Sequence, residues 1–498
     1  MEDVPAGEGR QTKAKFALDT GWVFASQIVT MAAGLLINII LGRFLGASGL
    51  GLYVMTLTVF SLASMIGGIG IPQAIVKYVA EFRDDHGRLT LVVSNCMVNA
   101  GILGGVTGLL LFLFSDAVAG IFGMPDLAGL IRIIAVLIPM MVLNNTLLGL
   151  LNGLQEMRAY SFRSMLRSVL LLGLNLGFVL VGWGVRGAVF ALFCTEVFVF
   201  LLLAYMMRRY LAIRIRDYVS VTREVVTFSG QVFLTSAVFL ILTYTDTLLV
   251  GYYLADYDVG LYAVAILVAR TAFLTLPGSV STVTYPSISR YFSQGDTGAI
   301  STLISTSIKC CLVLLSLLGI LIITLSETLL FLLFGPEFLP AVLPMTVLVF
   351  GMMFFGPGMS VGAAFSAMNQ PSYGYKVNIA MTIVNIALDV ALIPILGVVG
   401  AAIGTSVSFS LSVVAAFYLY RRVFGISIDV RPYVLTIPAV TLLTAVYFAT
   451  RGWINGYVLA ATLAALYAAY AYLIILSDVE RDGIWSMVRR MCAAYTVR

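Results

Sequence analysis

The sequence contains very little charge. Only 11% of its 498 residues are Asp, Glu, Lys or Arg, whereas 60% are hydrophobic. A soluble domain carries about 25% charged residues, so this composition excludes an ordinary soluble protein. Crossing the hydrocarbon layer as a helix takes roughly 20 mostly apolar residues, and such stretches recur from residue 21 to residue 476. The chain is therefore predicted to lie mostly within a lipid bilayer.

Histidine is almost absent, and cysteine follows no functional spacing. His86 is the single histidine, and the five cysteines show neither a metal-ligand nor a disulfide pattern. All but Cys492 lie in apolar runs, where cysteine behaves as a small hydrophobic residue. We therefore expect no metal site, no cofactor and no histidine-based catalytic triad.

The apolar runs are predicted to be helices. Strands of a membrane barrel would alternate apolar and polar residues over about 10 positions, whereas these runs are continuous and longer. The expected fold is an all-α membrane protein with about fourteen transmembrane helices. We place the spans near residues 21–41, 52–70, 90–115, 130–151, 165–183, 187–207, 229–253, 260–283, 304–325, 341–366, 377–395, 399–420, 434–450 and 457–476.

The placement of charge predicts the orientation of these spans. Lys and Arg gather in alternate loops, and the loops of the other side hold only Arg43, Arg132, Arg186 and Arg451. Because cytoplasmic loops are enriched in Lys and Arg, we expect a multi-pass protein of the cytoplasmic (plasma) membrane with both termini cytoplasmic. The same rule accounts for the net charge of +5, so nucleic acid is not an expected partner.

The first twelve spans contain an internal repeat. Residues 21–26 and 41–53 match residues 230–235 and 250–262 without a gap, and the second segment ends in Gly-Leu-Tyr in both copies. Each copy holds six spans, an even number, so the two copies enter the membrane with the same polarity and form a parallel repeat. Two further pairs follow in order: 122–126 with 334–337, and 184–188 with 397–401.

This repeat predicts the domain organisation. An N-lobe with spans 1–6 covers residues 1–208, a C-lobe with spans 7–12 covers 209–425, and residues 426–498 supply two additional spans and a cytoplasmic tail. The most basic connection begins at the predicted boundary between the lobes. An amphipathic segment at 73–85 is predicted to lie flat at the cytoplasmic interface.

Several glycine-rich motifs carry a family resemblance. In their order and spacing they resemble those of the polysaccharide exporters and oligosaccharide flippases, which belong to the multidrug, oligosaccharidyl-lipid and polysaccharide transporter superfamily. The resemblance implies two six-helix lobes in a V-shaped, MATE-like arrangement around a central cavity. The motifs are Leu-Gly-Arg-x-Leu-Gly at 41–46, Gly-Leu-Tyr at 51–53, Phe-Gly-Pro-Glu-Phe at 334–338, Asn-Gln-Pro at 369–371 and Gly-Val-Val-Gly-Ala-Ala at 397–402.

The resemblance also implies a function. A lipid-linked oligosaccharide or polysaccharide precursor would be translocated across the cytoplasmic membrane by alternating access. The expected partners are this polyprenyl-linked sugar and membrane lipids, with glycosyltransferases or a polymerase of the same pathway as further candidates. We expect no enzyme, because the outer loops are too short to hold a catalytic site.

Two other functions of the same fold stay open. A cation-coupled multidrug antiporter of this superfamily commonly has an acidic residue within the first span, but residues 21–41 hold none and Asp19 lies only at the edge. A flippase for the peptidoglycan lipid precursor has arginine within that span, whereas Arg43 lies beyond it. Both departures favour the oligosaccharide flippase.

Charged side chains at membrane depth are the first candidate site residues, because a lone arginine there costs about 2.5–3.5 kcal/mol. Arg270 lies about ten residues into the eighth span, roughly 15 Å along the helix, and a guanidinium suits bidentate binding of pyrophosphate. Asp246 lies near the outer end of the seventh span. It is interpreted as an ion-pair partner of Arg270, as a cavity group that changes partner when substrate arrives, or as a site for a coupling proton.

Four more charged residues are candidates. Arg163 and Arg167 lie one helical turn apart at the inner end of the fifth span, where they would attract a pyrophosphate-linked headgroup, although the positive-inside rule predicts the same charges without a function. Glu196 and Asp389 are acids at membrane depth. We interpret them as ion-coupling candidates or as hydrogen-bonding groups between helices.

Prolines and amides complete the set of candidates. Pro277 and Pro357 lie well inside their spans, where proline removes a backbone donor and can kink the helix, so they are hinge candidates for alternating access. Most buried amides are interpreted as hydrogen-bonding groups between helices, and some as cavity groups for sugar hydroxyls. These amides are Asn38, Asn99, Asn144, Asn145, Asn175, Asn378 and Asn385.

Overall fold

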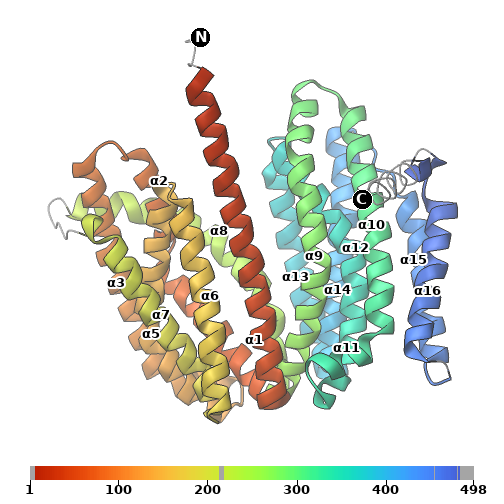
Figure 1. Ribbon diagram of the computed structural model, residues 1–498, viewed down its shortest axis with the longest axis horizontal. Helices are drawn as coiled ribbons and strands as arrows, with labels where there is room; N and C mark the ends of the chain where they lie inside the picture. The colour runs from red at the N-terminus through yellow and green to blue at the C-terminus, as the bar shows by residue number, and fades with distance from the viewer. Residues whose placement is uncertain (1–5, 212–217, 454, 479, 483–498) are drawn as a thin grey trace, which may run out of the picture. The chain divides into compact units, whose positions relative to one another are not determined.

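The computed structural model describes residues 6–211, 218–453, 455–478 and 480–482. These residues form helices joined by short connections, and none of those described is in a strand (Figure 1). The chain divides into two compact units, Met1–Ala263 and Val264–Arg498.

The first unit contains the helices up to the beginning of α9. The long helix α1 packs against α3, α5, α6, α7 and α8, and a 3₁₀ turn, η1, follows α7. The elements are α1 (Ala6–Gly68), α2 (Ile71–Glu81), α3 (His86–Leu113), α4 (Ser115–Ile121), α5 (Pro125–Gly153), α6 (Met157–Leu180), α7 (Gly184–Met206), η1 (Arg208–Tyr210), α8 (Tyr218–Tyr253) and α9 (Asp256–Ser293).

The second unit contains most of α9 and the remaining helices. Two short elements, α11 and η2, connect α10 to α12, and a π-helical turn η3 extends the last helix. The elements are α10 (Thr297–Thr324), α11 (Ser326–Leu333), η2 (Pro336–Ala341), α12 (Val342–Ala367), α13 (Pro371–Leu396), α14 (Val398–Phe424), α15 (Arg431–Thr450), α16 (Gly456–Tyr470) and η3 (Ala471–Ile475).

The all-α fold and the predicted spans are confirmed. Twelve helices of the described chain are long and apolar enough to cross a membrane, the first being Leu18–Gly68 with 51 residues. That helix contains two predicted spans, which are separated by non-helical backbone at Gly46 (φ 69°, ψ −174°). A positive φ of this kind favours glycine. With α1 counted as two spans, and with the 36-residue α8, the helices account for all fourteen.

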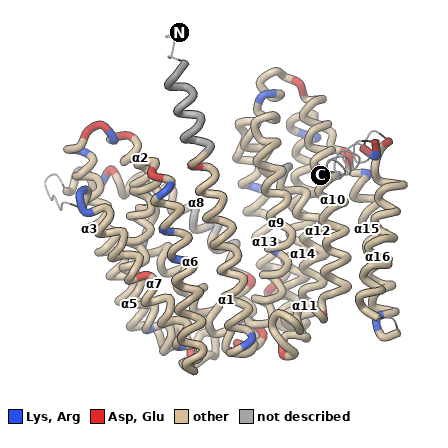
Figure 2. The backbone as a smooth tube through the Cα atoms, in the orientation of Figure 1, with Lys and Arg blue, Asp and Glu red and all other residues tan. Residues whose placement is uncertain are grey.

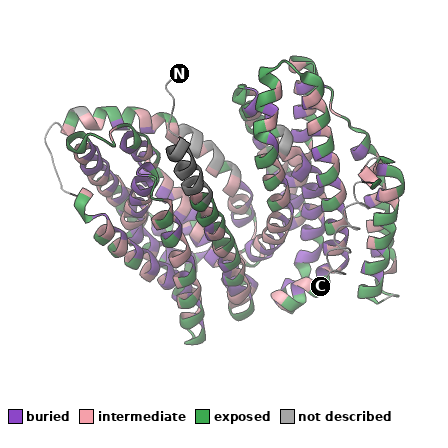
Figure 3. Ribbon diagram, turned by 45° about the horizontal axis from the view of Figure 1, so that its top comes forward, coloured by how far each residue is buried: buried purple, intermediate pink, exposed green. Residues whose placement is uncertain are grey.

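The surface of the helices fits a lipid environment. Buried residues lie mostly on the faces that helices turn toward one another within each unit, and exposed residues on the outward faces (Figure 3). Many of the outward residues are large and apolar, including Leu180 at 62% and Ile395 at 77% exposure. Most charges lie at helix ends and in connections (Figure 2). Apolar side chains on outward faces are stable when lipid covers them, so the chain is a multi-pass membrane protein.

The repeat seen in the sequence has a counterpart in local geometry. Gly184 and Gly397, the first glycines of one repeated motif, both have a positive φ, 59° and 60° respectively. Gly184 is the first residue of α7, and Gly397 directly precedes α14. Equivalent glycines of the two copies therefore both adopt a backbone conformation that favours glycine at the beginning of a helix.

The two copies of the Gly-Leu-Tyr motif also contact each other. A Cβ built on Gly51 would lie 1.8 Å from the carbonyl oxygen of Asp256, and one built on Gly260 would lie 2.0 Å from that of Ala47. In the repeat, Gly51 corresponds to Gly260 and Ala47 to Asp256. The contact is thus reciprocal, as expected where two equivalent segments meet about a two-fold axis.

The first unit extends beyond the predicted N-lobe because α8 packs against α1, α2 and α3. The side chain of Asn95 on α3 donates to Thr222 Oγ1 at 2.8 Å and to the Tyr218 carbonyl at 3.0 Å. The predicted lobe boundary at 208/209 is the boundary between the two copies of the repeat, and it stays a prediction.

The predicted amphipathic helix corresponds to α2, whose buried face packs on α5.

Candidate functional site

A buried ion pair joins α6 and α7 in the first unit. Nε and Nη2 of Arg167 both lie 2.6 Å from Glu196 Oε1. The other carboxylate oxygen of Glu196 accepts a hydrogen bond of 2.8 Å from the Asn144 amide on α5. The Glu196 side chain is fully buried, and that of Arg167 is 24% exposed. Two other helices, α5 and α6, therefore supply partners to one carboxylate of α7, and neither partner is adjacent to it in the sequence.

Arg163 adds a second guanidinium to this cluster. It lies one turn before Arg167 on α6 and is only 6% exposed. Among the described residues, its Nε and Nη2 have no hydrogen-bond partner. Two arginines and one glutamate leave one positive charge in excess. An unpaired buried charge is costly, so the cluster is suited to bind an anion.

A polar cavity of about 470 Å³ lies beside α6 in the same unit. Residues of α1, α2, α5 and α8 line it, together with Tyr160 of α6. Its hydroxyl and amide groups include those of Ser64 and Asn145. No lysine, arginine or acid is among its lining residues in the described chain.

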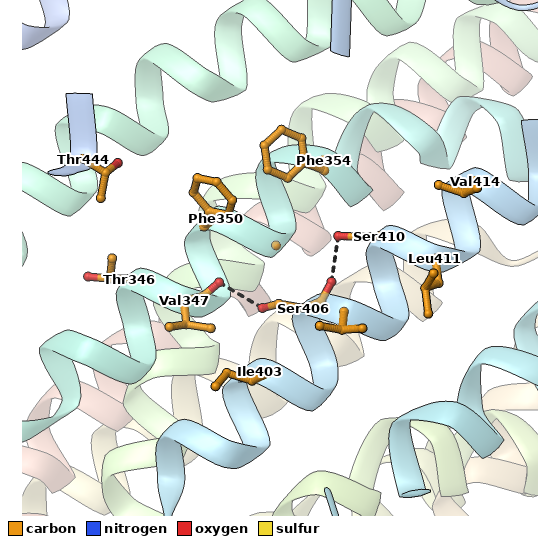
Figure 4. Close-up of a pocket in the computed structure, with 12 residues that line it drawn as sticks. Thr346, Val347, Phe350, Phe354, Ile403, Ser406, Ser410, Leu411, Val414 and Thr444 are labelled. Carbon is orange, nitrogen blue, oxygen red and sulfur yellow. Dashed lines mark hydrogen bonds between the residues drawn. The ribbon is translucent and has the colours of Figure 1, made fainter. Parts of the chain in front are cut away.

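The second unit contains a pocket of a different character, with a volume of about 500 Å³ (Figure 4). Phe350 and Phe354 of α12 line it along with aliphatic residues of α14. The Ser406 hydroxyl donates to the Val347 carbonyl at 2.9 Å, and the Ser410 hydroxyl donates to the Ser406 carbonyl at 2.8 Å. These two hydroxyls are engaged with backbone, and the lining is otherwise mostly apolar, so the pocket offers a headgroup little polar contact.

Asp246 and Arg270, the first predicted pair of site residues, lie on α8 and α9. Asp246, on α8, is 5% exposed and accepts a hydrogen bond of 2.6 Å from the Tyr262 hydroxyl on α9. Arg270 is half-buried on α9. The tyrosine partner was not predicted, although Tyr262 belongs to the repeated Gly-Leu-Tyr motif. The proposed exchange between Asp246 and Arg270 stays a prediction.

Asp389 lies on α13 in the second unit and is fully buried. A Cβ built on Gly404 of α14 would lie 2.1 Å from its Oδ1, so only glycine leaves room for the carboxylate there. Asn385, one turn earlier on α13, is also buried. The ion-coupling role predicted for Asp389 remains untested.

The two predicted hinge prolines lie close to the same contact between helices. Pro277 is inside α9 and Pro357 inside α12. A Cβ built on Gly356 would lie 3.3 Å from Pro277 Cγ and 3.0 Å from the Phe273 carbonyl oxygen. The segment before Pro357 therefore packs directly on the turn that contains Pro277. Whether α9 and α12 bend here stays a prediction.

These features define a class of protein, a helical membrane protein with a parallel repeat and charged groups within its spans. The family described as polysaccharide biosynthesis protein matches residues 16–292. The chain belongs to this family, and the resemblance drawn from its motifs is confirmed.

Two curated relatives illustrate the similarity. The chain is 31% identical over 139 residues to the lipid III flippase of Escherichia coli (strain K12), a match that covers 27% of this chain and 33% of that protein. It thus spans about a third of that flippase's length. It is 24% identical over 507 residues to stage V sporulation protein B of Bacillus subtilis (strain 168), covering 93% of this chain and 95% of that protein.

A solved structure supports the fold. The chain is similar to the inward closed conformation of lipid II flippase MurJ, with a TM-score of 0.71 and 15% sequence identity. The similarity covers 92% of this chain and 99% of that one. At this identity it shows a common fold over nearly the whole chain.

Proposed function

We propose that the chain is a flippase, not an enzyme, and that it translocates a lipid-linked oligosaccharide or polysaccharide precursor by alternating access. The observation that carries this proposal is the excess positive charge at Arg163. A buried guanidinium without a paired charge is costly, and an anionic group that pairs with it offsets this cost. Pyrophosphate between lipid and sugar is such a group, since its oxygens match the guanidinium donors.

Family membership supports the same proposal. The relatives named above include a lipid III flippase. We further propose that the protein resides in the cytoplasmic membrane with both termini inside, which agrees with the distribution of Lys and Arg. Glycosyltransferases or a polymerase of the same pathway are proposed as partners. Residues 1–5 and 483–498, at the two termini, lie outside the described structure.

The remaining predicted residues have proposed roles in the same cycle. Arg270 and Asp246 are proposed to contact the headgroup, and Asp389 to couple transport to an ion. Glu196 has Arg167 as its ion-pair partner, which favours a structural role and leaves ion coupling at Glu196 as the weaker proposal. Pro277 and Pro357 are proposed as bending points.

The test is transfer between leaflets. Vesicles with purified full-length protein would carry a fluorescent polyprenyl-pyrophosphoryl oligosaccharide, and a membrane-impermeant quencher would report its loss from the inner leaflet. We expect faster transfer than in protein-free vesicles. Transfer at the protein-free rate, with the protein folded and inserted, would contradict the proposal.

A further inference from the structure

The polar cavity of the first unit has an open rim and a buried interior. Gln73 of α2 and Asn152 of α5 are exposed at the rim, whereas Asn145 of α5 is half-buried and Ser64 of α1 is buried. The volume of about 470 Å³ is in the range of ordinary small-molecule sites, about 300–1,000 Å³.

Four polar side chains of the cavity are available for a ligand, whereas the Tyr244 hydroxyl donates to Ser61. Ser64 is 7% exposed, and its hydroxyl has no hydrogen-bond partner among the described residues. The side-chain amides of Gln73, Asn145 and Asn152 likewise form no hydrogen bond with any residue that the structure describes. Such groups cost free energy when they lose water without gaining a partner. A ligand with several hydroxyls would supply these partners.

The character of the lining restricts the ligand further. With no charged side chain among the lining residues described, an ionised group would enter without a counter-charge, which is unfavourable away from water. A hydrocarbon chain would leave the amides unpaired. Met65 and Phe233 add apolar surface, against which the C–H face of a sugar ring packs. The ligand that satisfies both surfaces is uncharged and rich in hydroxyls.

We propose that this cavity, lined by Ser64, Asn145 and Asn152, binds uncharged sugar units of the transported lipid. This inference rests on the proposed function and assigns one part of the substrate to one site. Tyr160 lines the cavity, and Arg163 follows it by three residues on α6, so the two side chains share a helix face. The sugar subsite and the buried guanidinium are therefore neighbours, as the sugar and pyrophosphate are in the lipid.

The test compares binding of three probes to the full chain in lipid nanodiscs: a short polyprenyl pyrophosphate, the same lipid with a neutral trisaccharide, and the same lipid with a uronate-containing trisaccharide. We expect the neutral trisaccharide to strengthen binding at least tenfold and the uronate form to bind more weakly than the neutral one. Asn145→Leu should lower the affinity for the neutral trisaccharide lipid about tenfold, or by about 1.4 kcal/mol. The affinity for the sugar-free lipid should stay the same.

A second cavity variant and a control variant distinguish loss of the sugar site from misfolding. Asn152→Leu, at the exposed rim, is the second variant, and it should reduce the sugar-dependent gain in the same direction. Asn38→Leu is the control, because the Asn38 amide donates to the Gly34 carbonyl within its own helix; it should bind all three lipids as the wild type does.

The outcomes separate this inference from the proposed function. If vesicles show leaflet transfer while the trisaccharide adds nothing to affinity, or while both cavity variants bind normally, the sugar subsite is refuted and the flippase proposal survives. If the trisaccharide strengthens binding through Asn145 but no transfer occurs, the site stands and the proposed function fails.

Discussion

Arg167 and Glu196 form a buried ion pair between α6 and α7, with both donors 2.6 Å from one carboxylate oxygen. Asn144 of α5 bonds the second oxygen at 2.8 Å. This geometry satisfies the carboxylate in full and fixes three helices relative to one another. Nε and Nη2 of Arg163 have no hydrogen-bond partner among the described residues, and two guanidinium groups face one carboxylate, so one positive charge is available to an anion.

Breaking the buried pair should destabilise the protein strongly. Arg167→Met removes the guanidinium that bonds the buried Glu196 carboxylate, and breaking a buried ion pair costs about 3–5 kcal/mol. We expect a clearly lower thermal midpoint in detergent. The double variant Arg167→Met/Glu196→Leu should recover part of the loss, because the buried carboxylate is removed together with its partner, while the Arg163 guanidinium keeps its charge in both variants.

The control for this prediction is Arg451→Met. Arg451 pairs with Glu327 at 2.9 Å, but the two side chains are 45% and 54% exposed, so the expected loss is at most about 1 kcal/mol. Equal midpoints for Arg167→Met and Arg451→Met would show that the α6–α7 pair does not hold the bundle together.

The reciprocal glycine contact should tolerate no side chain. Gly51→Ala and Gly260→Ala each place a Cβ within about 2 Å of a carbonyl oxygen, so α1 must shift away from the connection between α8 and α9. We expect both variants to lower the thermal midpoint and the transfer rate. Gly101→Ala is the control, since nothing lies within 4 Å of its built Cβ, and alanine in an open helical position is neutral or stabilising. Wild-type behaviour of both contact variants would argue against close packing of the two motifs.

The ion pair of Lys309 and Glu480 should make the C-terminal segment sensitive to pH. Burial acts to raise the pKa of the Glu480 carboxyl, but hydrogen bonds from Lys309 and Ser477 outweigh it, so this pKa is lowered from its usual value of 4.5. A lowered pKa in the folded state stabilises the docked segment above pH 4.5, and the effect is lost as pH falls through the folded pKa.

Hydrogen exchange measures this dependence. At pH 7, Glu480→Gln should increase exchange at the Ser477 amide, which donates to Glu480 Oε2 at 2.8 Å. After correction for intrinsic rates, the variant and the wild type should converge well below pH 4.5. A difference that stays constant with pH would mean that the charge of Glu480 does not dock the segment on α10.

Arg270 is tested by two substitutions. If its guanidinium contacts the pyrophosphate, Arg270→Ala should slow transfer by about tenfold or more, since a hydrogen bond to a charged group contributes about 1.5–3 kcal/mol. Arg270→Lys keeps the charge and should retain part of the activity. Normal transfer by both variants would remove Arg270 from the binding site.

The spans and the repeat could be predicted from the sequence because both depend on local patterns. Apolar length predicts helices, and repeated glycines such as Gly184 and Gly397 mark turns that need a positive φ. The partners of Glu196 and Asp246 could not be predicted. Arg167 and Tyr262 face them from other helices, and which faces meet depends on packing in three dimensions.

The sequence predicted that some of the buried amides line a cavity, but not which ones. Asn145 was one of seven amides with no ranking among them, and the structure separates it from its neighbour Asn144, which bonds Glu196. Adjacent residues on a helix point about 100° apart, so one amide serves the ion pair and the next lines the cavity. Nothing in the sequence distinguishes the two.

The most direct test of a flippase with a buried anion-binding guanidinium is to compare leaflet transfer of two fluorescent lipids that carry the same sugar. One lipid has a pyrophosphate linkage and the other an uncharged ether linkage. We predict that the wild type transfers the pyrophosphate lipid at least tenfold faster and that Arg163→Met abolishes this difference while the protein stays folded. Equal transfer of both lipids by the wild type, or an unchanged preference in Arg163→Met, would contradict the account.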